Sequence, residues 1–215
     1  GKIHIVWAGR FIPLKHPEYV VRLAKTLREK GYAYQIHMLG DGELEPLIRR
    51  DVESSGLSES FVFYGYTPPE KVRDVMEKCH IHLFTSNYLE GWGAVVNEGM
   101  NSGCVEVVNA QVGAAPYLIR HGVNGLVYPQ DRYDRMEMLV LALFAHWEER
   151  KQMGRAAYET IRDMWNAQHA AKALLRFADG LQRGVIEAQQ AGPLSIAPVT
   201  APGKMYRAMM QGEEI

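Results

Sequence analysis

The sequence has only two cysteines, Cys79 and Cys104, and neither belongs to a CxxC pair. This scarcity argues against a zinc ribbon and against a disulfide framework, and it fits a reducing compartment. We expect Cys104, which stands in an apolar stretch, to pack as a small hydrophobic side chain. A chain of 215 residues can bury a core without a disulfide or a metal, so neither is needed for folding.

Long apolar runs and a dominant charge sign are also missing. No run reaches the roughly 20 residues that span a bilayer, and no signal peptide is visible. The formal net charge is −1, so there is no broad basic field, and nucleic acid is not expected as a partner. We therefore expect a cytoplasmic protein without a transmembrane segment, in which any membrane association is made through another domain.

The two ends of the chain lack the features of a complete protein. Gly1 and Lys2 lead directly into a strand-like segment without an initial methionine, so we expect the chain to be part of a longer protein. The last stretch, 192–215, has three prolines and no clear periodicity. We expect one domain over 1–183, followed by a tail over 184–215 that is disordered or docks on an absent N-terminal domain. The tail methionines indicate packing against such an absent surface: Met205, Met209 and Met210.

What the sequence does have is a regular alternation of strand-like and helix-like segments. Strands are expected at 3–8, 34–39, 61–64, 81–85, 105–108 and 125–128, and helices at 17–30, 44–54, 68–78, 93–102, 114–120, 133–146, 150–164 and 167–181. Such alternation predicts an α/β fold: a doubly wound, parallel, six-stranded Rossmann-like sheet of order 3-2-1-4-5-6, with extra C-terminal helices. His37 and His82 fall in strands, where we expect core histidines rather than ligands.

In that strand order the winding reverses between strands one and four, and ligands bind at the carboxyl ends of those strands. The loops to inspect are therefore 9–16 and 86–93. The first loop carries Arg10 and Lys15, a rigid fork and a point charge that both suit phosphate oxygens. Taken alone, these two cations would be interpreted as a solvated surface pair.

The second loop reads Glu90-Gly91-Trp92-Gly93 and leads into a helix that contains Glu98. Glycines at a helix N-terminus let a ligand approach the backbone, and the free N–H groups there favour a phosphate. Carboxylates accept hydrogen bonds from hydroxyl pairs. A diphosphate between a sugar at Glu90 and a ribose at Glu98 would use all of these groups. The alternative is that Glu90 is an ordinary acid at a helix N-terminus and that Glu98 is a surface charge.

These residues resemble a known signature. Segment 90–98 (EGWGAVVNE) resembles the E-x7-E motif of the retaining glycosyltransferases of family 4, the group 1 glycosyl transferases, which have the two-domain GT-B fold. Gly9-Arg10 with Lys15, the GDG of 40–42 and the YGY of 64–66 stand where that family has its own loops. The segment 121–127 (HGVNGLV) is similar to its DGxNGxLV turn. The resemblance covers about residues 2–180, and the sequence departs from the pattern at Leu14, His16, Trp92, Val105 and Tyr117.

The resemblance implies the C-terminal, donor-binding half of a retaining hexosyltransferase. It implies a nucleoside-diphosphate sugar of UDP or GDP as the donor, no metal cofactor, and an acceptor bound mainly by a missing N-terminal domain, without which the fragment is inactive. Arg10 and Lys15 would hold the diphosphate, Glu90 the sugar hydroxyls and Glu98 the ribose. The implied catalytic residues are Arg10, Lys15 and Glu90, and the implied donor-binding residues are Gly9, Gly40, Asp41, Tyr66, Gly91, Trp92, Gly93, Ala94 and Glu98.

Other readings of the same residues remain open. A nucleotide-sugar epimerase or a sugar phosphorylase would keep the fold and change the chemistry, and a degenerate domain would serve interaction alone. A domain that serves interaction alone is disfavoured, because the sequence has all four charged residues of the candidate site: Arg10, Lys15, Glu90 and Glu98. A dinucleotide dehydrogenase is disfavoured because no G-x-G-x-x-G follows the first strand.

Overall fold

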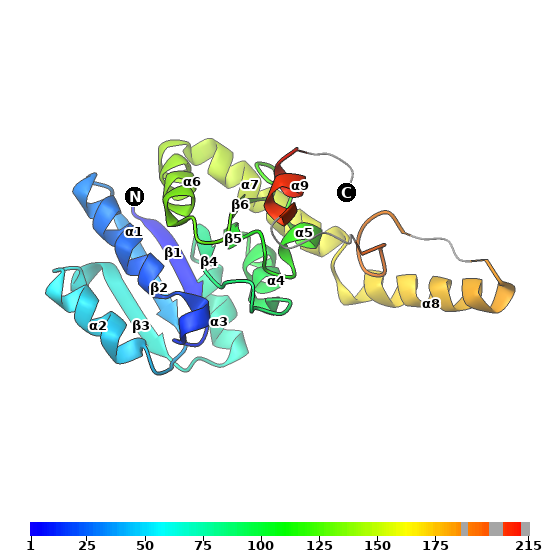
Figure 1. The fold of residues 1–215 in the computed structure, drawn as a ribbon, viewed down its shortest axis with the longest axis horizontal. Helices are drawn as coiled ribbons and strands as arrows, with labels where there is room; N and C mark the ends of the chain where they lie inside the picture. The colour runs from blue at the N-terminus through cyan, green and yellow to red at the C-terminus, as the bar shows by residue number, and fades with distance from the viewer. Residues whose placement is uncertain (186–188, 198–203, 212–215) are drawn as a thin grey trace.

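A computed structural model describes residues 1–185, 189–197 and 204–211. Its centre is one six-stranded parallel sheet of order β3-β2-β1-β4-β5-β6, which confirms the expected doubly wound topology (Figure 1). The strands are β1 (Ile3–Ala8), β2 (Tyr34–Leu39), β3 (Phe61–Gly65), β4 (Ile81–Phe84), β5 (Val105–Asn109) and β6 (Gly125–Tyr128). Each agrees with its expected range to within one residue.

Helices cover both faces of the sheet, because central parallel strands are apolar on both sides. The helices are α1 (Glu18–Glu29), α2 (Glu45–Ser54), α3 (Pro69–Met76), α4 (Ala94–Asn101), α5 (Ala115–Leu118), α6 (Tyr133–Ala145), α7 (Trp147–Asp163), α8 (Ala167–Arg183) and α9 (Met205–Gln211), with short 3-10 turns η1 (Pro13–Lys15) and η2 (Ser58–Ser60). One core joins α1, α2 and α6 to the sheet, whereas two smaller clusters lie among α3, α4, α5 and α7.

The last helices do not all follow the sheet. Figure 1 shows α8 extending away from the body of the domain, and α9 lying back against it near α5 and β6. Tyr206 and Met209 of α9 pack on the cluster that contains Phe84 and Val127. Part of α9 thus contacts this domain, and the expectation that the tail over 184–215 is disordered or docks on an absent N-terminal domain stays a prediction. Residues 186–188, 198–203 and 212–215 of the expected tail lie outside the described residues.

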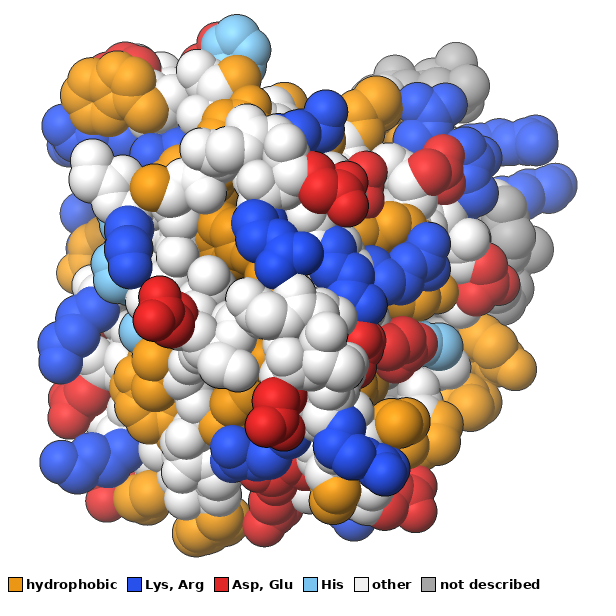
Figure 2. Space-filling model, turned by 90° about the vertical axis from the view of Figure 1, so that its left-hand side faces the viewer, with side chains coloured by type: hydrophobic (Ala, Val, Ile, Leu, Met, Phe, Trp, Pro, Cys, Tyr) orange, Lys and Arg blue, Asp and Glu red, His pale blue; other side chains and the backbone are white. Residues whose placement is uncertain are grey.

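The surface carries both charge signs. Figure 2, which views the molecule from the side of α1 and α2, shows basic and acidic side chains interspersed over that face. A representative pair joins the two helices there: the Lys25 ammonium lies 2.8 Å from the Asp51 carboxylate. Within the described part of the chain, no helix has both the length and the apolar character needed to cross a membrane.

Candidate functional site

The loops after β1 and β2 are in direct backbone contact. The Phe11 N–H donates to the Asp41 carbonyl at 2.7 Å, and the Gly9 N–H donates to the Leu39 carbonyl at 3.0 Å. Gly40 has a φ of +115°, and a Cβ atom at this position would lie 2.0 Å from the Gly9 carbonyl oxygen. Only glycine satisfies both the backbone conformation and this approach. The wall that these loops form is therefore made of main chain.

A pocket of about 250 Å³ lies against this wall, at the carboxyl ends of β1 and β2 and below the turn after β3. Six residues from the sequence prediction line it: Gly9, Arg10, Gly40, Asp41, Tyr66 and Glu98. The structure adds residues that the sequence reasoning did not find: Ala8, Leu39, Thr67, Pro69, Val72 and Val95. Thr67 follows the YGY turn directly, so its place beside that turn was the signal that could have found it.

Lys15 and Glu90 lie outside this pocket and pair with one another across the switch point. Their side chains are only 17% and 16% exposed, and the ammonium donates to the carboxylate. The Thr85 hydroxyl donates to the Lys15 carbonyl, and the Trp7 indole N–H donates to the Thr85 oxygen at 2.8 Å. The Lys15 ammonium also lies 5.2 Å from the centroid of the Phe84 ring. The position of the cation is thus fixed from both β1 and β4.

The turn between Glu90 and α4 is held by the segment that follows β5. The Gly113 N–H donates to the Gly91 carbonyl at 3.0 Å, and the Ala114 N–H donates to the Trp92 carbonyl at 2.9 Å. Gly93 occupies the N-cap position in a left-handed conformation, and no side chain caps the helix. An uncapped first turn presents its N–H groups to an anion, with the helix dipole adding to the attraction.

Trp92 is fixed by an aromatic cluster rather than by the sheet. Its indole N–H donates to the Asn97 amide oxygen at 2.8 Å. Its ring lies 5.5 Å from the Tyr117 ring and 5.9 Å from the Trp165 ring. Trp165 therefore ties the segment before α8 to the site, beside the turn that leads into α4.

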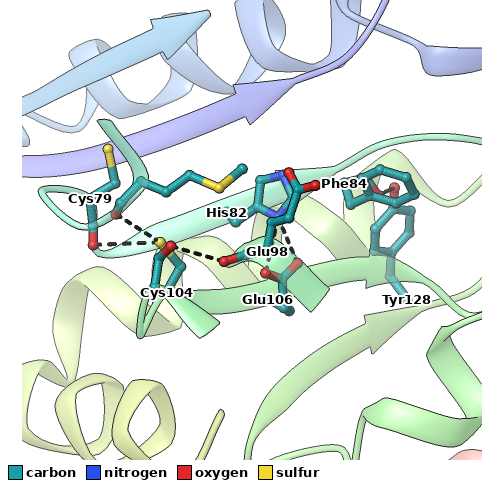
Figure 3. A network of polar contacts seen from close by, with 9 residues as sticks. Cys79, His82, Phe84, Glu98, Cys104, Glu106 and Tyr128 are labelled. Atoms are coloured by element: carbon teal, nitrogen blue, oxygen red, sulfur yellow. Dashed lines mark hydrogen bonds and ion pairs between the residues drawn. The ribbon is translucent and has the colours of Figure 1, made fainter. Parts of the chain in front are cut away.

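Glu98 projects from α4 above a buried polar pair in the sheet (Figure 3). His82 and Glu106 are neighbours on β4 and β5, both fully buried, and the His82 Nδ1 atom lies 2.8 Å and 3.0 Å from the two Glu106 carboxylate oxygens. Burial raises the pKa of Glu98, and the charge of His82 acts to lower that pKa. Burial likewise raises the pKa of Glu106 against the opposing effect of His82.

The helix that carries Glu98 rests directly on this pair. A Cβ atom on Gly99 would lie 2.0 Å from the Glu106 Oε1 atom and 2.7 Å from the His82 Nδ1 atom. His82 is a core histidine, as expected from its strand position, although its Nε2 atom has no hydrogen-bond partner among the described residues. Glycine at position 99 lets α4 approach the sheet where two polar side chains occupy the space beneath it.

His16, which departs from the family pattern, and Cys104, which was expected to be buried, both have defined contacts. The His16 Nδ1 atom lies 2.7 Å from a Glu18 carboxylate oxygen, and its ring stacks on Tyr19 at 4.9 Å. Cys104 is buried, as expected, and its thiol donates to the Met76 carbonyl at 3.3 Å (Figure 3). Over the described residues, no three histidine, cysteine or acidic side chains gather in a way that could hold a metal ion.

The chain is similar to proteins of one family. The family model described as "Glycosyl transferases group 1" matches residues 1–160. Among curated proteins, the chain is 28% identical over 183 residues to the D-inositol 3-phosphate glycosyltransferase of Nocardia farcinica, covering 81% of this chain and 40% of that protein. The chain thus spans less than half the length of this relative.

Solved structures share the fold at lower sequence identity. The C-terminal domain of the group 1 family protein LpcC from Francisella tularensis has a TM-score of 0.68 at 19% identity, over 75% of this chain and 85% of that one. Anabaena HepE, solved in complex with UDP-glucose, has a TM-score of 0.69 at 17% identity, over 85% of this chain and 49% of that one. The fold is the Rossmann-like half of the GT-B architecture.

Proposed function

Because this chain belongs to the group 1 glycosyl transferases, we propose that it is the donor-binding domain of a retaining hexosyltransferase and binds a nucleoside-diphosphate sugar at the β1/β4 switch point. The observation that carries the proposal is the Lys15–Glu90 pair beside a pocket lined by Arg10 and Glu98. Cation, carboxylate and uncapped helix converge at the place where a doubly wound sheet binds ligands.

The ion pair suggests how the site receives its ligand. Without a donor, the Lys15 ammonium and the Glu90 carboxylate neutralise each other in a partly buried position. A diphosphate would take over the ammonium and free Glu90 to accept hydrogen bonds from sugar hydroxyls. Arg10 is exposed at the pocket, so its guanidinium would reach the same phosphate oxygens.

The same groups would assist the transfer step. When the bond from the sugar C1 atom to the diphosphate breaks, negative charge develops on the leaving phosphate oxygen. Lys15, Arg10 and the N–H groups at the start of α4 would stabilise that charge. The acceptor oxygen forms the new bond to C1, and the proton of the acceptor hydroxyl passes to the departing phosphate oxygen. Glu90 would hold the sugar by accepting hydrogen bonds from its hydroxyl groups.

The nucleoside would occupy the 250 Å³ pocket. Glu98 would accept hydrogen bonds from the ribose diol, and the main-chain wall at Gly40 and Asp41 would border the base together with Tyr66. UDP is the first candidate for the nucleotide, because HepE was solved with UDP-glucose, and GDP is the second. A hexose is the first candidate for the sugar, because HepE was solved with UDP-glucose.

Three further parts of the proposal concern the whole protein. The acceptor would bind mainly to a second domain, since the chain covers 40% of its relative. The anomeric configuration would be retained, in line with the E-x7-E resemblance. Diphosphate binding would need no metal, because Arg10 and Lys15 supply the positive charge; calorimetric titrations with EDTA and with added Mg²⁺ would then give the same affinity.

Calorimetry of this chain against UDP, GDP and ADP tests the proposal. We expect one nucleotide to bind, and we expect hydrolysis or transfer of its sugar to be slow without the acceptor domain. No binding to any of the three at millimolar concentration would refute donor binding. Incubating the full-length protein with donor and acceptor, and reading the product anomer by NMR, tests retention.

A further inference from the structure

A second pocket of about 320 Å³ lies on the opposite edge of the sheet from the donor site. It is placed where β4 and β5 begin, between the residue before β4, His80, and the first two turns of α7. A Cβ atom on Gly154 would lie 2.4 Å from the Gly103 carbonyl oxygen, so α7 touches the turn before β5 through bare backbone. The two glycines form a floor without side chains.

The side chains around this floor are hydrogen-bond donors. The His80 Nδ1 atom accepts a hydrogen bond from the His4 N–H at 3.0 Å, so neutral His80 carries its proton on Nε2. Burial, together with the nearby Arg150 and His4, lowers the pKa of His80 and favours that neutral form. His80 therefore offers an N–H to the pocket and has no acceptor to offer.

Two cations complete the donor set. Arg150 donates one N–H to the Leu143 carbonyl, and four of its five N–H groups remain for another partner. Lys151 forms no ion pair among the described residues, and its ammonium lies 5.6 Å from the centroid of the Trp147 ring. Partial burial lowers the pKa of Arg150, and its guanidinium forms no ion pair with a carboxylate among the described residues.

No aspartate or glutamate lines the pocket within the described part of the chain. Glu149, on the first turn of α7, faces another partner, because its carboxylate oxygen lies 3.7 Å from the His146 Nδ1 atom. Trp147 is 61% exposed at the rim, where a ring could lie against its face. A cavity with three donors, two positive charges and one open aromatic face matches a compact anion that is attached to a ring.

We propose that this pocket binds a small phosphomonoester, with Arg150, Lys151 and His80 on the phosphate and the sugar or base ring against Trp147. The volume is that of a small-molecule site at the lower end of the usual range. The pocket is separate from the proposed donor site. It lies at the amino end of β4, whereas the carboxyl end of β4 forms the switch point with β1. Its existence does not depend on the proposed function.

NMR titration of this chain at constant ionic strength tests the proposal. The probes are inorganic phosphate, glucose 6-phosphate and UMP, and the signals are the Trp147 indole N–H and the Gly103 and Gly154 amides. We expect all three probes to shift these signals, and the ring-bearing esters to bind more tightly than phosphate. Sodium chloride at equal ionic strength should leave these NMR signals unchanged. Chemical-shift changes with chloride that equal those with the phosphates would refute the proposed site.

Variants separate this pocket from the donor site. Lys151→Gln and Arg150→Lys should each weaken phosphate-ester binding roughly tenfold, the expected effect of losing one charge-assisted contact. Arg155→Gln, on the same helix, is the matched control and should not change it. Binding that survives both pocket variants but disappears in Lys15→Gln would place the phosphate at the donor site and refute this proposal. Arg150→Lys keeps the charge. NMR signals of this variant that are unchanged away from the pocket would show that the fold is intact.

Discussion

The Lys15 ammonium and the Glu90 carboxylate form an ion pair between residues that are 75 positions apart. The pair joins the loop after β1 to the loop after β4, the two neighbouring strands at which the chain reverses its winding. Each partner is largely buried, and each is held by backbone contacts on its own side. The two loops are therefore joined by a charge contact between partly buried side chains.

Replacing Lys15 should weaken donor binding. In Lys15→Gln we expect the affinity for the best-binding nucleoside diphosphate to fall roughly tenfold to a hundredfold, because one charge-assisted hydrogen bond to phosphate is lost. Calorimetry measures the change. Lys25→Gln is the matched control, because Lys25 also pairs with an acid, and that pair joins α1 to α2 away from the site. Equal losses in both variants would contradict a role for Lys15 in the site.

Glu98 should form hydrogen bonds with the ribose hydroxyls. Glu98→Gln is expected to weaken binding of the ribonucleoside diphosphate several-fold, and to leave binding of its 2′,3′-dideoxy counterpart unchanged. The raised pKa of Glu98 adds a pH effect, since the acceptor is lost as the carboxyl takes up a proton. As the pH is lowered, the affinity for the ribonucleotide should therefore begin to fall at a higher pH than it would if Glu98 had an ordinary carboxylate pKa. An equal effect on both nucleotides would contradict ribose contact.

Gly99→Ala should destabilise the fold even though alanine favours helices. The new Cβ atom would meet Glu106 at 2.0 Å, and overpacking of this kind costs about 1–3 kcal/mol. The gain in helix propensity is about 1 kcal/mol, so the net change is a loss. Urea unfolding measures it, and Asn101→Ala in the same helix is the control that should not destabilise. Stability equal to the control would show that the buried pair moves aside easily.

His37 should make the domain sensitive to acid. Burial and the nearby His4 lower the pKa of His37 from 6.5 to about 4 in the folded chain. The unfolded chain takes up its proton near pH 6.5, so stability from this group is present above that pH and is lost as the pH falls towards 4. The Tm of His37→Asn should depend less on pH over this window. His146→Gln, which removes an exposed histidine, should keep the wild-type slope.

The strand order could be predicted because each strand carries apolar residues and each is followed by a helix that ends in glycine or a turn. Arg10 and Glu98 could likewise be placed at one edge, because the carboxyl ends of β1 and β4 must meet there. The contact of α9 with the domain could not be predicted, because a short apolar segment after several prolines has no local signal for its packing partner. Tyr206 and Met209 find that partner only in the folded domain.

The buried pair was outside the reach of sequence reasoning for a different reason. His82 and Glu106 are 24 positions apart, and only the register of β4 with β5 makes them neighbours. A lone acid in a strand gives no indication of its partner. The requirement for glycine at position 99 could not be predicted either. It comes from the side chains on the sheet beneath α4 and not from the helix itself.

The contact between Gly40 and Gly9 limits how this domain could be re-engineered. One wall of the pocket consists of main-chain atoms packed so closely that no side chain can be added at position 40. Under the proposed function, substitutions that change nucleotide preference would therefore fall at other positions that line the pocket, such as Tyr66 and Thr67. A library confined to these two positions would sample donor preference while leaving the loop geometry intact.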